Sequence, residues 1–391
     1  MVTSPVTGKQ PEICTFQNKV PLTVTDTVIG SGWRCGICGH FGRSLNNATR
    51  NYFQGVGHLH DVKRMTPRVI FRQFTAAGMI GLLLVVLLPS CTLDPDLPFR
   101  VGTNIWPGYE PLYLAREMGH LNENRIKLVE LPNATEVIQA LRNEVLEAAA
   151  LTLDEALSVV QDGYDLKVVL IMDFSHGGDA LLAHPTIHQL ADLRGKRIGV
   201  ERTAVGSLLL DAALQKASLS LKDVTLVPLT VDRHLESYKQ YNIDALVTFE
   251  PTSSKILAQG AKSLFDSTHI PNRIIDVLVV RSDIAKHRTE TLRYLLEGYF
   301  EALEYQHSNP LQAAQHMMSR LNLSGSELLS ALDGLHQPDL EENRALLIGN
   351  ERQTLTDSLQ HLIRLMLDQN LLHSKPVTSN LLSGQWLPEA Q

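Results

Sequence analysis

Acidic residues recur in the short segments that follow apolar runs along this 391-residue chain. They are Asp154, Asp173, Asp179, Glu201 and Glu250, and Arg202 is the one Lys or Arg beside them. Carboxylates gathered at one place attract a cationic or amine-bearing molecule and repel a bare anion such as nitrate or a sulfonate. Acids in the first turn of a helix also offset the helix dipole, so an anionic ligand stays open beside the organic nitrogenous ligand that we favour slightly.

Two aromatic residues lie at the start of the same series of segments. NIWPGYEP (104–111) puts Trp106 and Tyr109 in a loop with Pro and Gly. A Trp in such a turn has little local core to enter, and binding residues are often carried on loops. We therefore expect both rings to form an aromatic wall of a ligand site, on which a neutral heterocycle could also stack.

Two segments have both a functional and a purely structural interpretation. In LTLDE (151–155), Thr152 can cap the helix that follows and Asp154 lies in its first turn, so plain capping explains both residues equally well. In MDFSHGGDA (172–180), Asp173, Ser175 and Asp179 surround a Gly-Gly pair. Such a pair lets backbone N–H groups approach a ligand closely, and it also makes an ordinary tight turn.

Ser175 beside His176 is the nearest approach to a nucleophile with its base. Adjacent residues on a loop rarely face each other as the geometry of a catalytic triad demands. We therefore expect no catalytic residue and no enzyme, and the sequence indicates no cofactor.

Two segments of the second half complete the candidate site. GVERTAVGS (199–207) runs from an apolar strand into a helix whose free N–H groups, around Thr203 and Gly206, could hold an anion or a dipole. It lacks the spacing of a dinucleotide-binding or P-loop motif, so nucleotide binding is not supported. TFEP (248–251) places Glu250 at a strand end before Pro251, where an acid can also serve the helix dipole alone.

Apolar runs and helical patterns alternate from Phe99 onwards. FRVGTNIW is followed by PLYLAREMGHL and LKVVLIM by DALLAH, and a second series begins at KRIGVE. This alternation is typical of βαβ units that build a mostly parallel sheet flanked by helices. IIDVLVV indicates one more strand, and residues 283–370 indicate helices throughout. We expect an α/β fold of two lobes, 98–185 plus 275–391 and 186–274, with a ligand cleft at the carboxyl ends of the strands.

The composition excludes some partners. The net charge of −7 and the pI near 6.1 leave no basic face for nucleic acid, which a phosphate binder needs. All four cysteines lie within the first 91 residues, so the main body has no disulfide and no thiol chemistry.

An apolar run precedes the α/β region. Basic residues from Lys63 to Arg72 are followed by thirteen uncharged residues, 76–88. This pattern predicts a signal peptide over 65–90, because a spanning helix needs roughly 20 apolar residues. The sequence LPSC (88–91) resembles the lipobox of bacterial lipoproteins, in which the cysteine, here Cys91, is lipidated and becomes the mature N-terminus. Pro89 departs from that pattern, so an uncleaved or differently cleaved signal remains the alternative.

Residues 1–64 precede this signal and stay unassigned. With Met65 as the start, they would be a dispensable extension or an upstream misread of the start codon. CGICGH (35–40) offers a pair of cysteines and His40, but a structural zinc site needs four ligands and Cys14 is the only other cysteine nearby. We predict no metal site.

The order of the motifs resembles the periplasmic solute-binding proteins of ABC importers. The residues that carry the likeness are NIWPGYEPLYLARE, LTLDEAL, ADLRGKRIGVE, DALVTFEP and LFDST. The likeness is closest to the branch that takes up nitrate, sulfonates, taurine and thiamine-type pyrimidines, and it covers roughly residues 98–390. DLRGKRIGV is its most specific element, because in that family it opens the second lobe.

The resemblance implies a hinged, monomeric receptor that binds a small molecule between its lobes and performs no chemistry. Its closed form would dock on a membrane permease, and a lipid on Cys91 would tether it outside the cytoplasm. The same fold also hosts a pyrimidine synthase of thiamine biosynthesis, an alternative marked by a cysteine-rich motif that is absent after Cys91. The sensor module of a signalling receptor would need a second membrane segment and an output domain, which the sequence does not indicate.

Overall fold

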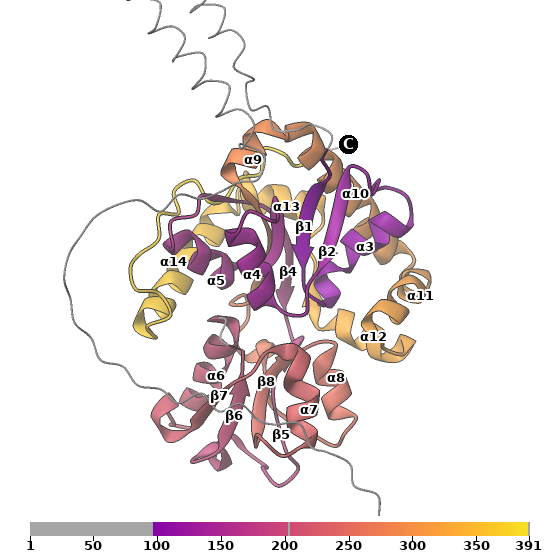
Figure 1. Cartoon of the computed structure of the whole chain (residues 1–391). Helices are drawn as coiled ribbons and strands as arrows, with labels where there is room; N and C mark the ends of the chain where they lie inside the picture. The colour runs from indigo at the N-terminus through magenta and orange to yellow at the C-terminus, as the bar shows by residue number, and fades with distance from the viewer. Residues whose placement is uncertain (1–96, 202–203, 390–391) are drawn as a thin grey trace, which may run out of the picture. The chain divides into compact units, whose positions relative to one another are not determined.

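The computed structural model describes residues 97–201 and 204–389, which belong to one compact unit (Figure 1). The expectations for 1–64, for the signal segment 65–90, for Cys91, for Arg202 and for Thr203 lie outside the described residues. No helix within the described ranges is both long and apolar enough to cross a membrane.

The first sheet has six strands in the order β11-β4-β10-β3-β1-β2. They are β1 (Phe99–Thr103), β2 (Ile126–Glu130), β3 (Ala148–Thr152), β4 (Leu166–Ser175), β10 (Ile275–Arg281) and β11 (Leu335–His336). The first four run in one direction, and β10 and β11 run against them. Every residue of β3 is buried, because helices cover both faces of this sheet.

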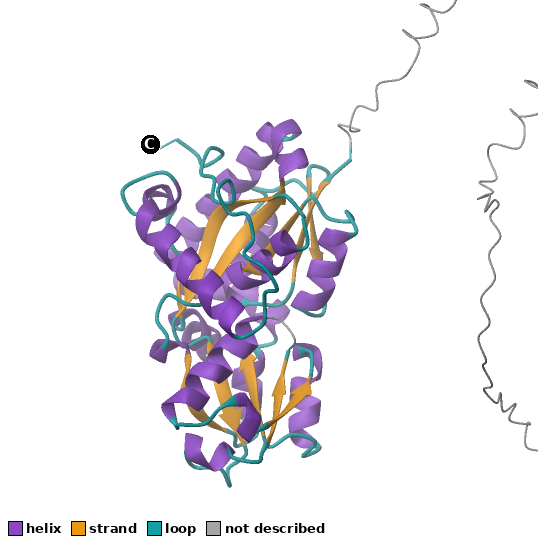
Figure 2. Ribbon diagram, turned by 90° about the vertical axis from the view of Figure 1, so that its left-hand side faces the viewer, coloured by secondary structure: helices purple, strands orange, loops and turns teal. Residues whose placement is uncertain are grey.

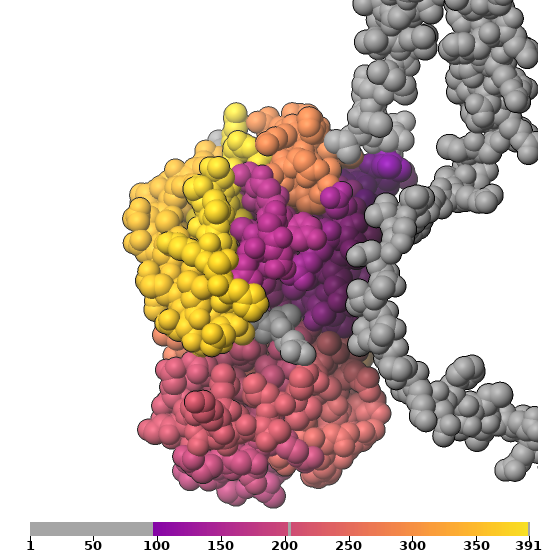
Figure 3. All heavy atoms as spheres, turned by 60° about the vertical axis from the view of Figure 1, so that its left-hand side comes forward, coloured from indigo at the N-terminus to yellow at the C-terminus, as the bar shows by residue number. Residues whose placement is uncertain are grey.

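Nine described helices accompany the first sheet and form lobe 1 with it (Figure 2). They are α3 (Glu110–Glu117), α4 (Ala134–Arg142), α5 (Leu153–Gln161), α9 (Ser282–His287), α10 (Thr289–Ser308), α11 (Pro310–Leu321), α12 (Gly325–Asp333), α13 (Leu340–Leu347) and α14 (Arg352–Asp368). Capping boxes start α12 at Ser324 and α13 at Asp339. Figure 3 shows the C-terminal segments, in yellow, covering one side of lobe 1.

The second sheet has five strands in the order β7-β6-β8-β5-β9 and forms lobe 2 with three helices. The strands are β5 (Asp179–Ala183), β6 (Arg197–Val200), β7 (Thr225–Pro228), β8 (Ala245–Phe249) and β9 (Lys262–Asp266), and the helices are α6 (Ala204–Lys216), α7 (His234–Lys239) and α8 (Thr252–Leu257). Only β5 runs against the other strands. Leu181 packs in the apolar cluster on one face and Leu182 in the cluster on the other, so both faces are covered.

The predicted α/β fold class is confirmed, with corrections at two segments. DALLAH, predicted as a helix of the first lobe, contains strand β5, which pairs with β8 and β9 in the second sheet. An apolar run that is buried on both faces does not alternate, and its period cannot distinguish a strand from a helix. The chain therefore enters lobe 2 before Asp179 and not at residue 186. The second correction is β11, which interrupts the helices expected over 283–370.

Two crossing segments connect the lobes. The chain leaves β4 through residues 176–178 to β5, and it returns from β9 through a short 3-10 helix, Ser267–His269, to β10. The Ser175 and Ser267 hydroxyls lie 2.8 Å apart, and the Gly177 N–H donates to the Ser267 hydroxyl at 2.6 Å. Since β5 and β10 each begin at a crossing, their first residues lie beside the carboxyl ends of the neighbouring strands.

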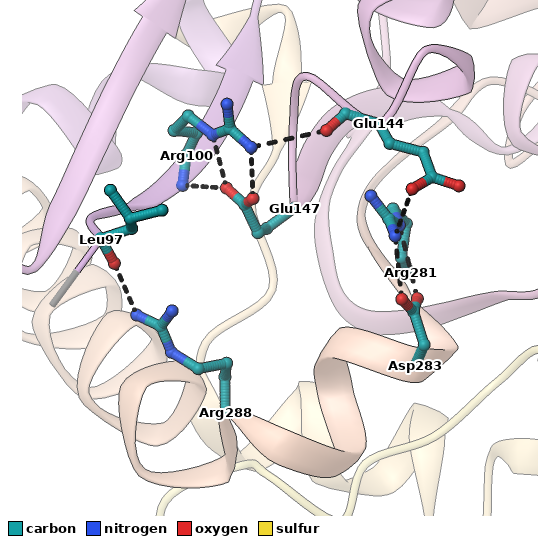
Figure 4. A network of polar contacts seen from close by, with 7 residues as sticks. All are labelled: Leu97, Arg100, Glu144, Glu147, Arg281, Asp283 and Arg288. Carbon is teal, nitrogen blue, oxygen red and sulfur yellow. Dashed lines mark hydrogen bonds and ion pairs between the residues drawn. The ribbon is translucent and has the colours of Figure 1, made fainter. Parts of the chain in front are cut away.

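The end of the first sheet that lies away from the crossing segments carries paired charges (Figure 4). Glu147 accepts hydrogen bonds from the Arg100 backbone N–H at 2.7 Å and from its guanidinium at 2.5 and 2.9 Å. Arg281, the last residue of β10, pairs with Glu144 at 3.1 Å and with Asp283 at 2.8 Å. We call these five residues the outer charge network.

Candidate functional site

A small cavity lies between the lobes and is lined from both. Lobe 1 contributes Asn104, Trp106, Tyr109, Ala134, Thr152, Glu155 and Asp276, and lobe 2 contributes Asp179, Val205 and Phe249. Its volume is about 30 Å³. That room suits one or two water molecules, whereas sites for organic ligands are roughly ten times larger. A solute therefore enters only if the lobes part or the lining side chains move.

Sheet register brings the acids of lobe 1 together. Asp276, near the start of β10, lies opposite Thr152 of β3 on one side and Asp173 of β4 on the other. Glu155 lies in the first turn of α5, where its carboxylate accepts the Thr152 N–H at 3.0 Å in a capping box. These strand and helix positions place the carboxyl groups at one edge of the sheet.

Lobe 2 places one more acid against this group. Asp179 is the first residue of β5, and it pairs across the sheet with Phe249, the last residue of β8. The Phe249 ring packs edge-on against Trp106 of lobe 1, with 5.7 Å between ring centroids. The two lobes thus meet through an aromatic contact beside a carboxylate.

The aromatic side chains of lobe 1 already use their polar hydrogens. The Trp106 indole N–H donates to Asp173 Oδ2 at 2.9 Å, and the Tyr109 hydroxyl donates to Asp276 Oδ1 at 2.5 Å. Asp173 Oδ1 and Asp179 Oδ2 have no hydrogen-bond partner among the described residues, although the two side chains are 0% and 4% exposed. The site therefore presents spare acceptor atoms.

Burial makes these acids hard to ionise. It raises the pKa of Asp173 and Glu155 to about 8 and the pKa of Asp179 to about 7. Repulsion from Asp179 adds to the pKa shift of Asp173, and burial with repulsion from Asp173 holds the pKa of Asp276 well above its usual range. The acids lie close enough to oppose one another's charge.

Four of the predicted site residues line the cavity: Trp106, Tyr109, Thr152 and Asp179. Asp173 lies directly behind the Trp106 ring, through the hydrogen bond above. Asp154 is buried next to the cavity lining, and burial raises its pKa to about 6. The expectation that Trp106 has no core to enter is wrong: it is 4% exposed and belongs to the core of lobe 1 as well as to the cavity wall.

Three predicted residues lie away from the cavity lining. Ser175 joins the two crossing segments, as described above. The Cβ of any residue replacing Gly206 would lie 2.6 Å from the Val200 side chain, so Gly206 permits close helix packing, and its neighbour Val205 lines the cavity instead. Glu250 accepts hydrogen bonds from the Ser254 hydroxyl at 3.0 Å and from the Ser254 N–H at 3.3 Å, which caps α8.

The Gly-Gly pair has a structural role as well. The Gly177 N–H donates to Ser267, and the Gly178 N–H donates to the Gly334 carbonyl at 3.1 Å. A Cβ on Gly178 would lie 2.7 Å from the Trp106 ring. The pair thus lets Trp106 pack closely, and its N–H groups are already bonded within the protein.

Sequence reasoning missed Asp276, Glu155 and Phe249. Asp276 lies inside the apolar run IIDVLVV, whereas the expectation covered only residues that follow the carboxyl end of a strand. Because β10 is reversed, its beginning lies at the cavity. A charged residue within a strand that is otherwise wholly apolar was the available signal, since buried acids are rare without a partner.

Two mixed sheets with an acid-lined cavity between them define a two-lobed binding-protein fold. A model of the family described as NMT1/THI5 like matches residues 106–313. The chain belongs to this family. A Brucella abortus protein, named as a binding protein without a stated ligand, is 25% identical over 59% of this chain and 74% of its own length.

Solved structures show the same fold. The alkanesulfonate-binding protein SsuA of Xanthomonas axonopodis pv. citri, bound to MOPS, has a TM-score of 0.62 at 17% identity, covering 75% of this chain and 99% of its own. The periplasmic aliphatic sulphonate binding protein SsuA of Escherichia coli has a TM-score of 0.59 at 19% identity, covering 74% and 99%. The resemblance inferred from the sequence motifs is confirmed.

Proposed function

We propose that this protein is the substrate-binding component of an ABC-type importer. It captures a small organic solute in the cavity between its lobes and delivers it to a membrane permease. The observation that carries the proposal is the cavity itself, because its walls come from both lobes and are complete only when the lobes meet. The family and the names of the solved relatives support it.

Closure follows from contacts that only the closed form makes. Asn133 at the start of α4 donates to Asp232 of lobe 2 at 3.2 Å, and Thr135 donates to Glu201 at 3.1 Å. On other sides of the interface Lys255 donates to the Leu321 carbonyl at 3.0 Å. A solute that adds contacts to both lobes shifts a pre-existing equilibrium towards this form.

The location belongs to the same proposal. An importer receptor works outside the cytoplasm, and we propose that a lipid on Cys91 holds it near its permease. A substitution of Cys91 by Ser should release the protein from membranes into the soluble extracytoplasmic fraction without changing solute affinity. Retention on the membrane would contradict the tether but not the receptor.

The enzyme alternative finds no support in the described residues. The Ser175 hydroxyl contacts the Ser267 hydroxyl and accepts the Asp179 N–H at 3.2 Å, and the neighbouring His176 is exposed. Ser175, which the sequence offers as the nucleophile, thus joins the two crossing segments, and the exposed His176 makes no side-chain hydrogen bond with it. We propose that the protein binds its solute without turnover.

The test is ligand binding with a blocked cavity. Small-molecule fractions of a cell extract are added to the purified protein, and the thermal midpoint is measured, since a ligand of the folded state raises it. Ala134→Trp fills the cavity and should abolish the rise, whereas Gln139→Trp on the exposed side of the same helix should keep it. An equal rise in both variants, or chemical conversion of the bound compound, would overturn the proposal.

A further inference from the structure

The cavity contains acids and no base among the described residues. Asp179, Glu155 and Asp276 line it, and Asp173 lies behind Trp106. No Lys, Arg or His belongs to the lining that the structure describes. Carboxyl groups confined at such a place can ionise together only if a positive charge joins them, and otherwise they keep protons.

The hydrogen bonds of the cavity wall also leave acidic oxygen atoms without donors. The two strong donors of the wall, the Trp106 N–H and the Tyr109 hydroxyl, are bonded to Asp173 and Asp276. Two carboxylate oxygens, Asp179 Oδ2 and Asp173 Oδ1, and the Thr152 hydroxyl have no described partner, and all three side chains are at least nine-tenths buried. A buried acceptor without a partner is costly, so the group that completes the site is a donor.

The rest of the wall favours an organic group over a bare ion. Trp106, Tyr109 and Phe249 line the same cavity as the acids, and aromatic rings attract cations through their negative faces. No group of three or more His, Cys, Asp or Glu side chains in the described ranges is placed to hold one metal ion. Acids and aromatic rings together match a carbon skeleton that carries a positive charge.

We propose that the solute is a small organic cation bearing an ammonium, amidinium or guanidinium group. Its N–H groups donate to Asp179 from lobe 2 and to Asp276 of β10 from lobe 1, and its carbon skeleton lies against Trp106 and Phe249. This inference rests on the proposed receptor function. It separates the chain from the sulfonate-binding relatives, because a sulfonate would meet these carboxylates without a balancing cation among the described lining residues.

The experiment uses probes matched in size and opposite in charge. Ethylammonium is compared with ethanesulfonate, and benzylammonium with benzenesulfonate, with benzyl alcohol as the neutral member and CaCl₂ as the metal ion. Each is added to the purified full chain, and affinity is taken from the dependence of the thermal midpoint on concentration and from calorimetry. The variants are Asp179→Asn and, as the control, Asp357→Asn, which makes the same change on an exposed face of α14.

We expect the cationic member of at least one pair to bind and its sulfonate partner not to bind. Asp179→Asn should weaken the cation about 10- to 100-fold, as expected for loss of a hydrogen bond to a charged group, and Asp357→Asn should change nothing. Melting of the unliganded Asp179→Asn protein at or above the wild-type midpoint would show that the variant is folded.

Other results overturn the inference in distinguishable ways. Binding of a sulfonate, of benzyl alcohol or of calcium in preference to the ammonium probes would reject an organic cation and leave the receptor function standing. Equal loss in both variants would reject the role of Asp179. If neither the probes nor any extract fraction raises the midpoint, this inference and the proposed function fail together.

Discussion

The same strands of lobe 1 end in two very different charge environments. At the outer end, β1 and β10 carry Arg100 and Arg281, and each guanidinium is paired with a carboxylate near solvent. At the cavity end, β10 carries Asp276 beside Asp173 of β4, both buried and neither facing a described cation. One end of the sheet is electrically balanced within the protein, and the other is not.

This contrast shows that the protein pairs its own charges at the outer end of the sheet and leaves the acids at the cavity end without a described cation. Charges that serve stability are paired, as in the outer charge network, because an unpaired buried charge destabilises a fold. An unbalanced group of acids persists when it serves another purpose, and sites of that kind commonly cost the folded protein some stability. The following predictions, from the largest expected effect to the smallest, test the contrast.

The largest effect should come from pH. The pKa values of Asp173, Glu155 and Asp179 are raised, so near neutral pH the folded protein holds protons that the unfolded chain has released. Stability of the unliganded protein should therefore fall as pH rises from 6.5 to 8.5, by about 4 kcal/mol. The buried His234, whose pKa is lowered to about 4, opposes this trend only slightly, because the unfolded chain has lost half of that charge by about pH 6.5 and nearly all of it by about pH 7.5.

Urea unfolding at half-unit steps of pH measures the fall. A bound organic cation should reduce or abolish it, because the ionised acids then have a partner. A free energy of unfolding that stays level or rises over this range would contradict the unbalanced cavity end.

Neutralising a single cavity acid should stabilise the empty protein. At pH 8.5 Asp179→Asn removes a buried charge that lacks a partner, and the free energy of unfolding should rise by about 2 kcal/mol. The control Asp357→Asn, on an exposed helix face, should change it by less than about 0.5 kcal/mol. Destabilisation by Asp179→Asn at this pH would mean that the charge is satisfied within the protein.

Removing one donor from the cavity end should destabilise the protein. Trp106→Phe keeps most of the ring but deletes the N–H that Asp173 accepts, so a loss of about 1.5 kcal/mol is expected near pH 7. Trp386→Phe is the matched control, because Trp386 is equally buried in the core of lobe 1 and makes no hydrogen bond through its side chain to a described residue. If both variants lose the same amount, the bond to Asp173 contributes nothing measurable.

Neutralising an acid at the outer end should have a small effect, opposite in sign to that of Asp179→Asn at the cavity end. Glu147→Gln removes the charge that faces Arg100 and should lower stability by about 1 kcal/mol, since solvent partly screens this pair through the more exposed Arg100. Glu144→Gln, at a more exposed position of the same network, should have almost no effect. Stabilisation by Glu147→Gln would remove the contrast between the two ends.

The sequence predicted the two-sheet fold and part of the site. Runs such as AAALT and the capping pattern after Thr152 are local signals, and the structure has β3 and α5 where they indicate. Asp276 could not be placed, because its position depends on the direction of β10, which is fixed by pairing with strands more than 100 residues away. The pairing of Asp179 with Phe249 could not be predicted either, because it also joins strands that are far apart in the sequence.

Other residues were assigned the wrong partner. Glu250 follows a strand, as a ligand-binding acid would, but Ser254 one turn later takes its carboxylate. Ser175 follows the same positional rule and is bonded to Ser267, 92 positions away along the chain. Position after a strand indicates the edge of a sheet, whereas the partner of a side chain there depends on tertiary contacts.

The crossing segments place two of the cavity acids next to the connections between the lobes. Asp179 and Asp276 are the first and second residues of the strands that begin where the chain passes between lobes, and the hydroxyls of Ser175 and Ser267 tie the two passages together. A solute that binds either carboxylate would therefore act directly on the backbone of the crossing segments. Recognition and motion would then share one short stretch of covalent chain, and no relay of side chains through either core would be needed.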